Sequence, residues 1–234
     1  MHNLSRLELI TSKEKIEKIK EKNILLIGLG GVGGYTFETL VRSGIENITI
    51  VDGDTFEESN LNRQVLSTID SLNKNKTDVA ELRAKQINPE ITIKKITKVL
   101  TKDNINEINF KDYDYVIDAC DTVDLKKELI RITTKNNIKF ITCMGTGNKF
   151  HPELLEITTL DKTEYDPIAK ILRKYVKEER INKKIKVISS KEKPIKTKTT
   201  TIGSNAFVPA TAGILITSYI INDIVGEIWK KYTT

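Results

Sequence analysis

One glycine-rich stretch has the residue types and spacing to bind a nucleotide: Asn23-Ile-Leu-Leu-Ile-Gly-Leu-Gly-Gly-Val-Gly-Gly34. Gly28, Gly30 and Gly33 fit the G-x-G-x-x-G pattern, in which one glycine permits a tight turn, one lets the backbone approach a phosphate, and one allows a helix to pack closely on a strand. The helix that follows such a loop presents unpaired N–H groups and a positive dipole end to an anion. By itself the pattern indicates a nucleotide or dinucleotide site, or a strand–helix turn that binds nothing.

A second chemical signal is Asp52, which directly follows an apolar run at 47–51 and stands 19 residues beyond Gly33. A Rossmann-type site places at this distance the carboxylate that accepts hydrogen bonds from ribose hydroxyls. The plainer alternative is a turn residue that ends a strand. A polar, turn-prone segment follows from Asp54 to Gln64, and loops held by a rigid scaffold are where binding and catalytic residues concentrate.

An alternation of strands and helices must position these residues. Apolar runs predict strands at residues 23–27, 47–51, 92–96, 114–118 and 139–143. Helical patterns precede the first strand and lie between the strands, at residues 13–22, 35–43, 75–87, 103–108 and 123–136. Strands that alternate with helices at these lengths predict an α/β fold, namely a Rossmann-like, doubly wound, mostly parallel sheet.

The second half of the sequence departs from this rhythm and is expected to form an irregular, basic extension. Its elements are expected to be a glycine-containing loop at 144–149, strands at 155–160 and 186–190, a helix beginning at Asp166-Pro167, a mobile loop at 191–204, and an apolar helix from 207 to about Trp229. We expect a single domain over residues 1–234. Its parts would be a helical arm at 1–22, a nucleotide-binding core at 23–150, and a substrate-binding and dimerisation extension at 151–234.

The positive charge is concentrated in one segment. The chain carries a net charge of +6, which favours an anionic partner, and residues 170–198 hold twelve Lys or Arg against three Glu. This segment suits nucleic-acid phosphates, and neutralising Lys183, Lys184 and Lys186 would then weaken binding and flatten its salt dependence. The alternative is a solvated helix face, because the sequence has no aromatic-interleaved stacking platform and no recognisable RNA-binding fold.

Several classes of protein are disfavoured by the remaining composition. Residues 1–9 lack the layout of a signal peptide, and the uncharged stretch 207–222 falls short of the roughly 18 to 20 apolar residues of a membrane span. That stretch predicts a core or dimer-interface helix. Cys120 and Cys143 lie in apolar runs, which favours packing roles, no disulfide and a reducing compartment. His2 and His151 are isolated, without metal-ligand spacing. We therefore expect a cytoplasmic protein without stable membrane insertion.

Taken together, these residues carry a family resemblance. The glycine loop, Asp52, Asn60-Leu-Asn-Arg63-Gln64, Lys76 and Asp118-Ala-Cys-Asp121 resemble, in order and spacing, the E1-like adenylating superfamily of the ThiF, MoeB and HesA type, whose members activate carboxylates with ATP. The match spans roughly residues 6–145. The later part resembles one branch, the tRNA threonylcarbamoyladenosine dehydratases, in these motifs: Met144-Gly-Thr-Gly-Asn-Lys149, Lys162-Thr163, Asp166-Pro167, Arg173-Lys174, Gly203-Ser204 and Phe207-Val-Pro209.

The resemblance implies a role for each site residue. It assigns Asp52 to the ribose of ATP, Asn60, Arg63 and Lys76 to the phosphates, and Asp121 to Mg²⁺. It also places further residues in the ATP site: Gly28, Gly30, Gly31, Gly33, Asp54 and Gln64. Arg6 aligns with an arginine that reaches the triphosphate from a partner subunit, so the resemblance implies a homodimer with Arg6, Arg63, Lys76 and Asp121 as its catalytic residues.

The chemistry of that branch makes physical sense of the residue types. A carboxylate becomes a good acylating agent once it attacks the α-phosphate of ATP, and the site must offset the repulsion between the carboxylate and the triphosphate. An arginine fork and a lysine point charge can do so, and a nearby carboxylate is useful there if it holds Mg²⁺. A nitrogen of the same modified nucleoside in tRNA can then close on the activated carbonyl and expel AMP, because proximity replaces an external nucleophile.

Three alternatives share part of this pattern. An E1-like adenylyltransferase of a ubiquitin-like sulfur carrier uses the same ATP site, although many of its members carry a CxxC…CxxC zinc site that two distant cysteines cannot build. An NAD-dependent oxidoreductase shares the glycines and Asp52 but has no use for the cluster of phosphate-binding charges. A nucleotide-binding regulator would bind ATP without catalysis. Whether a sulfur carrier or another accessory protein acts as a partner stays open at the level of sequence.

Overall fold

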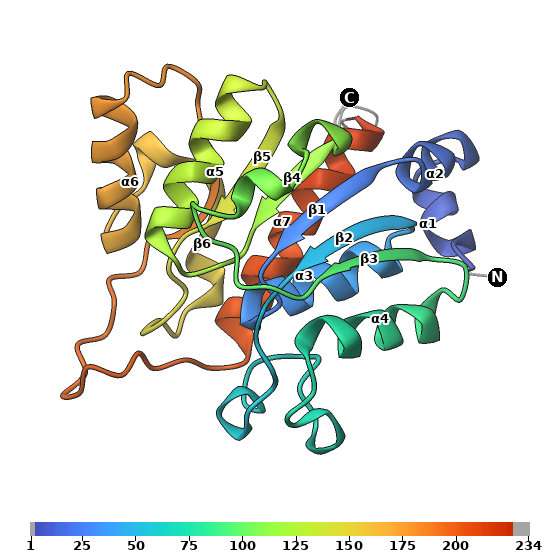
Figure 1. Ribbon diagram of the computed structural model, residues 1–234, viewed down its shortest axis with the longest axis horizontal. Helices are drawn as coiled ribbons and strands as arrows, with labels where there is room; N and C mark the ends of the chain where they lie inside the picture. The colour runs from blue at the N-terminus through green and yellow to red at the C-terminus, as the bar shows by residue number, and fades with distance from the viewer. Residues whose placement is uncertain (1–2, 227–234) are drawn as a thin grey trace.

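The protein is built around one seven-stranded sheet with the strand order β3-β2-β1-β4-β5-β7-β6. The computed structural model describes residues 3–226, and Figure 1 shows the sheet with helices on both of its faces. All neighbouring strands are parallel except β6, which pairs antiparallel with β7. The strands span β1 Asn23–Ile27, β2 Asn47–Val51, β3 Thr92–Ile96, β4 Tyr115–Asp118, β5 Lys139–Cys143, β6 Leu155–Thr159 and β7 Lys186–Ser190. The predicted Rossmann-like, doubly wound α/β fold is confirmed.

The order of the strands reverses beside β1. From β1 the chain first adds β2 and β3 on one side, and then returns to add β4 and β5 on the other. The amide of Gly28 donates to the carbonyl of Val51, and the amide of Ala119 donates to the carbonyl of Ile27. The loops that leave β1 and β4 therefore begin side by side. In an open α/β sheet a ligand binds at such a switch point, outside the carboxyl ends of the strands.

Alternate residues of β1 face two separate apolar layers. Ile24 and Leu26 pack with residues of α3 and α7, whereas Leu25 and Ile27 pack with residues of α5 and of the segment between β3 and β4. Because successive side chains of a strand point to opposite faces, a central strand covered on both faces is apolar throughout. This burial explains why residues 24–27 are an unbroken hydrophobic run.

The helices begin and end where the sequence provides the appropriate residues. Gly44 has φ of 95° directly after α3, the left-handed conformation that ends many helices. Asp166 accepts from the Ala169 amide at 2.8 Å and Pro167 is the first residue of α6, as the sequence predicted. The helices span α1 Ser5–Ile10, α2 Lys13–Lys20, α3 Gly31–Arg42, α4 Lys76–Ile87, α5 Val123–Lys135, α6 Pro167–Glu178 and α7 Phe207–Val225.

Helix α7 is a core helix of this fold. Figure 1 shows α7 and α3 side by side behind the sheet, and their contacts are the most extensive between any two helices in residues 3–226. By length and composition alone α7 could cross a membrane, and half of it is buried. The uncharged stretch 207–222 is shorter than a membrane span, but the helix continues to Val225 and is 19 residues long, so its length does not exclude a span. Its packing on α3 is what favours a core role. Trp229 and His2 lie outside the described residues.

The helix predicted at 103–108 is wrong. The chain there forms two short 3₁₀ turns, Ile105–Glu107 and Phe110–Asp112. The Asn104 side chain accepts from the Thr101 amide at 2.8 Å, and the Asn109 side chain donates to Asp112 at 2.7 Å. Such local side-chain bonds compete with a continuous helix, while the turns still bury Ile105 and Phe110.

The second half of the chain extends the same sheet. Strands β6 and β7 form its far edge, and α7 returns to the centre of the molecule beside α3. Between Ser190 and Phe207 the chain has neither helix nor strand, as predicted for residues 191–204. Figure 1 shows this orange segment as a long excursion at the lower left, which ends at the start of α7.

Candidate active site

A cavity of about 530 Å³ opens over the carboxyl ends of β1, β2, β4 and β5. Its walls come from segments that are far apart in the sequence: the glycine loop after β1, residues 52–54 after β2, residues 60–64 and 76, residues 98–100 after β3, residues 119–122 after β4, residues 143–147 after β5, and residues 202–209 before and in α7. The cavity therefore lies at the topological switch point, where the fold favours a nucleotide site.

The glycines of the loop meet different steric demands. Gly28 has φ of 92°, and a Cβ there would lie 2.9 Å from the Ala119 carbonyl oxygen. A Cβ at Gly33 would lie only 1.9 Å from the Gly28 carbonyl oxygen, so Gly33 lets α3 pack on the loop; it does not line the cavity. At Gly30 the nearest heavy atom to a Cβ would be 4.0 Å away. The backbone at Gly30 and Gly31 lines the open cavity at the start of α3, where an anion would meet free N–H groups.

Asp52 holds the loops after β1 and β2 together. One carboxylate oxygen accepts from the Leu29 amide at 2.7 Å and the other from the Asp54 amide at 2.9 Å. Burial raises the pKa of Asp52, an effect that the charge of Lys76 and the two amides only partly offset. Asp52 lines the cavity, where its carboxylate is positioned to accept hydrogen bonds from a ligand as well.

Lys76 is the first residue of α4 and reaches the cavity from a buried position. Its amine forms an ion pair of 2.9 Å with Asp54, whose side chain is 65% exposed while that of Lys76 is 7% exposed. The amine also lies 6.0 Å from the centre of the Phe56 ring. The lysine is thus held in place by its stem, whereas its anionic partner is free to move in solvent.

The segment 60–64 contributes three further polar side chains to the cavity. Asn60 accepts from the Glu57 amide, and Arg63 donates to the Ser59 carbonyl at 2.7 Å. Gln64 is buried, and within the described residues its side-chain oxygen has no hydrogen-bond partner. Since buried polar atoms are normally paired, this oxygen is suited to accept a bond from a ligand or from water.

The two aspartates after β4 have opposite environments. Asp121 is exposed and lines the cavity. Asp118 is fully buried, accepting from Lys126 at 2.9 Å and Thr142 at 2.6 Å, and does not line the cavity. The Asp118 carboxylate, at the end of β4, therefore turns into the scaffold beneath the cavity. The cause is the buried Lys126, which α5 places beside the ends of β4 and β5.

The two cysteines lie next to this buried pair. Burial raises the pKa of the Cys120 thiol, and burial raises that of Cys143 to about 12. Both groups are therefore protonated thiols at neutral pH, which does not favour nucleophilic attack. This agrees with their predicted role as packing residues.

Charges in the cavity wall balance one another. Three acidic side chains, Asp52, Asp54 and Asp121, face three basic ones, Arg63, Lys76 and Lys98. Binding a triphosphate and a carboxylate in this cavity therefore needs additional positive charge or a rearrangement of the ion pairs. Within residues 3–226 no group of three or more His, Cys, Asp or Glu could hold a metal ion, although a single carboxylate with phosphate oxygens suffices for Mg²⁺.

Arg6 lies outside this cavity. It is exposed on α1, a helix without buried residues, and does not belong to the lining of the cavity in its own chain. Its predicted entry from a partner subunit stays a prediction.

Sequence reasoning missed one wall of the cavity, formed by Lys98, Val99 and Leu100. A Cβ at Gly53 would lie 2.3 Å from the Val99 amide nitrogen, so the two loops after β2 and β3 cross in close contact. The position of these residues directly after a predicted parallel strand was an available signal, since the carboxyl ends of such strands meet at one edge.

The loop after β5 forms the opposite wall and is held by a second buried pair. The Gly145 amide donates to Asp166 at 2.9 Å, and the Lys149 amine donates to the Gly145 carbonyl at 2.7 Å. The Lys149 amine lies 3.6 Å from Asp166, with both side chains buried. Gly145 to Gly147 therefore form a wall whose position is set by side chains behind it.

Fold and cavity together define an α/β protein of the nucleotide-binding type, with a glycine-rich loop at the topological switch point. A model of the ThiF family matches residues 2–221. The chain belongs to the ThiF family.

The chain is similar to known proteins in both sequence and structure. The tRNA threonylcarbamoyladenosine dehydratase of Bacillus subtilis is 34% identical over 99% of this chain and 98% of its own length. The dehydratase of Haemophilus influenzae is 36% identical over 71% of this chain and 64% of its own length. The crystal structure of E. coli tRNA N6-threonylcarbamoyladenosine dehydratase, TcdA, in complex with ATP superposes with a TM-score of 0.88 at 29% identity, covering 94% of this chain and 93% of that one.

Proposed function

We propose that this protein is an ATP-dependent tRNA threonylcarbamoyladenosine dehydratase. One observation carries the proposal: the likeness to the B. subtilis dehydratase runs from end to end of both chains, so it includes the second half as well as the nucleotide-binding core. The cavity at the carboxyl edge supports it, because the glycine loop, the Asp52 carboxylate and the cations Arg63 and Lys76 all line that cavity.

The reaction would proceed in two steps. A carboxylate oxygen of the threonyl group forms a bond to the α-phosphorus of ATP, and the bond to the β-phosphate oxygen breaks to release pyrophosphate. A nitrogen of the same nucleoside then attacks the acyl carbon, the carbon–oxygen bond to AMP breaks, and the nitrogen loses its proton to solvent. The reacting groups belong to one substrate, so proximity supplies much of the rate.

The side chains of the cavity would divide the binding of ATP. Asp52 accepts hydrogen bonds from the ribose, while Asn60 and Gln64 orient the phosphates. Arg63 offers parallel N–H donors to phosphate oxygens. Lys76 exchanges its pairing with Asp54 for a phosphate, which costs little because the Asp54 carboxylate stays hydrated.

Mg²⁺ and Arg6 would supply the missing positive charge. Asp121 fits Mg²⁺, since its carboxylate is exposed to the cavity and has no ion-pair partner among residues 3–226. The ion would neutralise charge on the phosphates when bound. Arg6 would enter from a second copy of the chain: α1 leaves Leu9 and Ile10 exposed, an apolar surface suited to a homodimer. We place this enzyme, with its tRNA substrate, in the cytoplasm.

The decisive experiment compares substrates. The purified protein is incubated with ATP, Mg²⁺ and either modified tRNA or a ubiquitin-like sulfur carrier; pyrophosphate release and the mass of the tRNA nucleosides are measured. The proposal expects release with modified tRNA and loss of one water from the modified nucleoside. Stimulation by the carrier protein alone would instead identify an E1-like adenylyltransferase of a sulfur carrier.

A further inference from the structure

Exposed aromatic side chains gather next to the wall of the cavity. Phe150 and Phe207 meet edge to face with ring centres 5.0 Å apart, and the His151 ring lies 6.5 Å from that of Phe150. Phe150 is 58% exposed and Phe207 is 39% exposed. Their backbone positions are set by the cavity wall, because Asn205 donates to the Lys149 carbonyl at 2.7 Å. The rings are thus presented to solvent from a well-determined position.

A fourth aromatic residue lies close to the same wall. Tyr165 directly precedes Asp166, the residue that binds the Gly145 amide. Its backbone has φ of 52°, which is rare for a bulky side chain, and the side chain is 49% exposed. The amine of Lys193 lies 5.0 Å from the centre of its ring, a cation–π contact.

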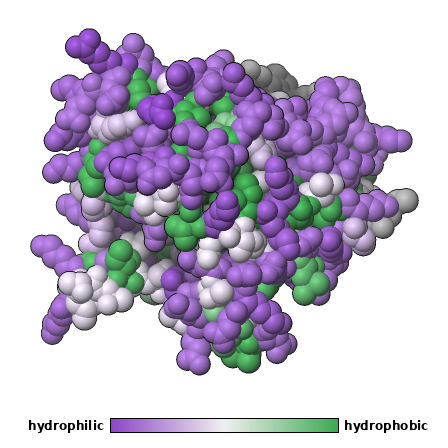
Figure 2. All heavy atoms as spheres, viewed as in Figure 1, coloured by the Kyte–Doolittle hydropathy of each residue, from purple (hydrophilic) through white to green (hydrophobic). Residues whose placement is uncertain are grey.

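The segment from residue 193 to residue 198, which begins beside Tyr165, contains lysines without acidic partners. Among the described residues, Lys193, Lys196 and Lys198 form no ion pair with Asp or Glu. Figure 2 shows the protrusion made by this segment at the lower left, with hydrophilic residues among intermediate and apolar ones. The segment is anchored to the cavity wall, because the Gly203 amide donates to the Asn148 side chain at 2.7 Å and Ile202 lines the cavity.

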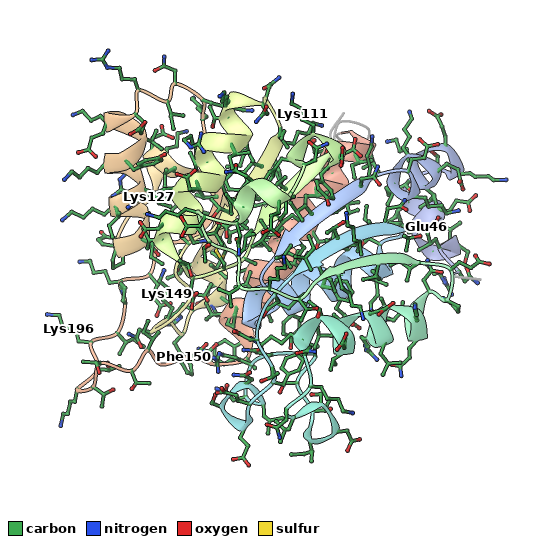
Figure 3. All side chains as sticks on the ribbon, in the orientation of Figure 1. Glu46, Lys111, Lys127, Lys149, Phe150 and Lys196 are labelled. Carbon is green, nitrogen blue, oxygen red and sulfur yellow. The ribbon has the colours of Figure 1, made fainter. Side chains whose placement is uncertain are left out.

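Two other lysines of the basic segment, Lys183 and Lys184, lie at the opposite edge of the sheet. Lys183 donates to Asn137 at 3.1 Å, just before the amino end of β5. Lys184 is exposed beside it and Lys111 precedes β4. Figure 3 shows Phe150 and Lys196 at one end of the molecule and Lys111 at the other. The positive charge of residues 170–198, which is continuous in the sequence, is therefore divided in the structure between two edges of the sheet.

We propose that Phe150, Phe207, Tyr165 and the lysines 193, 196 and 198 form a binding surface for the single-stranded loop of the tRNA substrate beside the reacting adenosine. This inference rests on the proposed function. Aromatic faces stack on unpaired bases of any sequence, and lysines follow the backbone phosphates. The surface borders the cavity, so a base that enters the cavity would leave its neighbours over these rings.

Charge favours RNA over a protein as the occupant. A protein partner that covers the rings would also bury lysines lacking acidic partners, which is costly unless the partner brings matching carboxylates. A nucleic acid provides one phosphate per nucleotide for those lysines. The combination of exposed rings and unpaired lysines thus matches single-stranded nucleic acid.

The aromatic part is tested with an anticodon stem-loop RNA that carries the modified adenosine. Phe150→Leu and Tyr165→Leu, singly and together, are compared with Phe150→Tyr and with the control Leu82→Ala, an exposed apolar residue on α4. We expect the double variant to bind the RNA at least about tenfold more weakly and to raise KM for RNA by a similar factor. KM for ATP should stay near the wild-type value in all of these variants. The RNA affinities of Phe150→Tyr, which keeps an aromatic ring, and of Leu82→Ala should stay near that of wild type.

The lysine part uses a charge-matched control. The triple variant Lys193→Gln, Lys196→Gln, Lys198→Gln is compared with Lys111→Gln, Lys183→Gln, Lys184→Gln, which removes the same charge from the opposite edge. The first should lower the slope of log affinity against log salt by about 2, since each lost phosphate contact on a single strand contributes about 0.7. The second should lower it by less than half as much.

Three results would overturn the proposal. The first is unchanged RNA affinity in the aromatic double variant, and the second is a larger loss of affinity in the opposite-edge triple variant. The third is a change of oligomeric state in the aromatic variants without a change in RNA affinity, which would assign the surface to protein contact. Failure of the proposed function is separate: wild type would bind RNA without ATP-dependent loss of water from the nucleoside.

Discussion

Two aspartate–lysine ion pairs at the carboxyl edge of the sheet have the same length, 2.9 Å, and opposite environments. Lys126 and Asp118 are both buried beneath the cavity. Lys76 is buried as well, but its partner Asp54 is mostly exposed at the cavity wall. Lys126 has three partners, since its amine also donates to Thr142 and to the Cys143 carbonyl.

The difference separates scaffold from site. Burial acts to lower the pKa of Lys126, but the charge of Asp118, its hydrogen bond and the two nearby cysteines together outweigh burial, so the pKa is raised and the lysine stays protonated. Such a pair cannot exchange partners without leaving a bare charge in the interior. The Lys76–Asp54 pair can open, because water solvates the released carboxylate. Two ion pairs with the same nitrogen–oxygen distance thus have different functions. The Lys126–Asp118 pair holds β4, β5 and α5 together, and the Lys76–Asp54 pair is available to an incoming anion.

The largest effect is expected from breaking the buried pair. Lys126→Met leaves Asp118 charged and unpaired in the interior, and should lower the free energy of unfolding by about 3–5 kcal/mol. Urea denaturation followed by circular dichroism measures the loss. Replacing both partners, Asp118→Asn with Lys126→Met, should recover part of it; a single variant as stable as wild type would show that the pair does not hold the scaffold.

Breaking the exposed pair should remove activity and leave the fold. Lys76→Met keeps the apolar stem and removes the charge that stabilises the phosphates, so pyrophosphate release should fall at least about 100-fold. The free energy of unfolding should change by no more than about 1 kcal/mol, as for other half-exposed ion pairs. Asp54→Asn serves as the control that removes the pair but keeps the lysine. Near-normal turnover in Lys76→Met would contradict its assignment to the phosphates.

Two variants that are each inactive at the site should complement one another in a mixed dimer, whereas a variant that destabilises the scaffold should not. If Arg6 acts on the partner's cavity, mixing and re-associating the inactive Arg6→Ala and Lys76→Ala variants should restore about a quarter of wild-type turnover. Half of the dimers then contain both chains, and each of these has one intact site. Replacing Lys76→Ala by Lys126→Met in the mixture should restore less, because that chain is unstable. No recovery in the first mixture would exclude an arginine shared between subunits.

The smallest effect concerns Asp52, whose environment lies between those of the two pairs. Its pKa is raised by burial, so the folded state binds its proton more tightly than the unfolded state. The free energy of unfolding of wild type, relative to Asp52→Asn, should therefore rise as the pH falls from 7 towards the ordinary aspartate value of about 3.9. Urea titrations at several pH values measure it, and the opposite slope would show that the amides of Leu29 and Asp54 outweigh burial.

Much of the nucleotide-binding half was predictable because its signals are local. Nearby residues alone predict the conformations of the run 23–27, the glycines after it and the strand before Asp52. Apolar periodicity indicates the strands, and glycine tolerates a positive φ. The helix predicted at 103–108 was wrong because asparagine side chains there form hydrogen bonds with nearby groups and so compete with the helix. The spacing of apolar residues gives no information about that competition.

Contacts between distant segments were not predictable. Nothing near Asp118 in the sequence indicates that its carboxylate turns away from the cavity, because Lys126 lies on the next helix and Thr142 on the next strand. Similarly, Phe150 and Phe207 are too far apart in the sequence to form a pattern, and their rings meet only because the loop after β5 and the start of α7 come together beside the cavity.

By itself, the sequence determined the α/β alternation, the glycine loop and the family resemblance, since each depends on residue types at short, fixed spacing. Only the tertiary structure decided which charges face the cavity. Whether a carboxylate is exposed, as Asp121 is, or buried against a lysine, as Asp118 is, depends on what neighbouring strands and helices place beside it. In the same way, it divided one basic segment between two edges of the sheet.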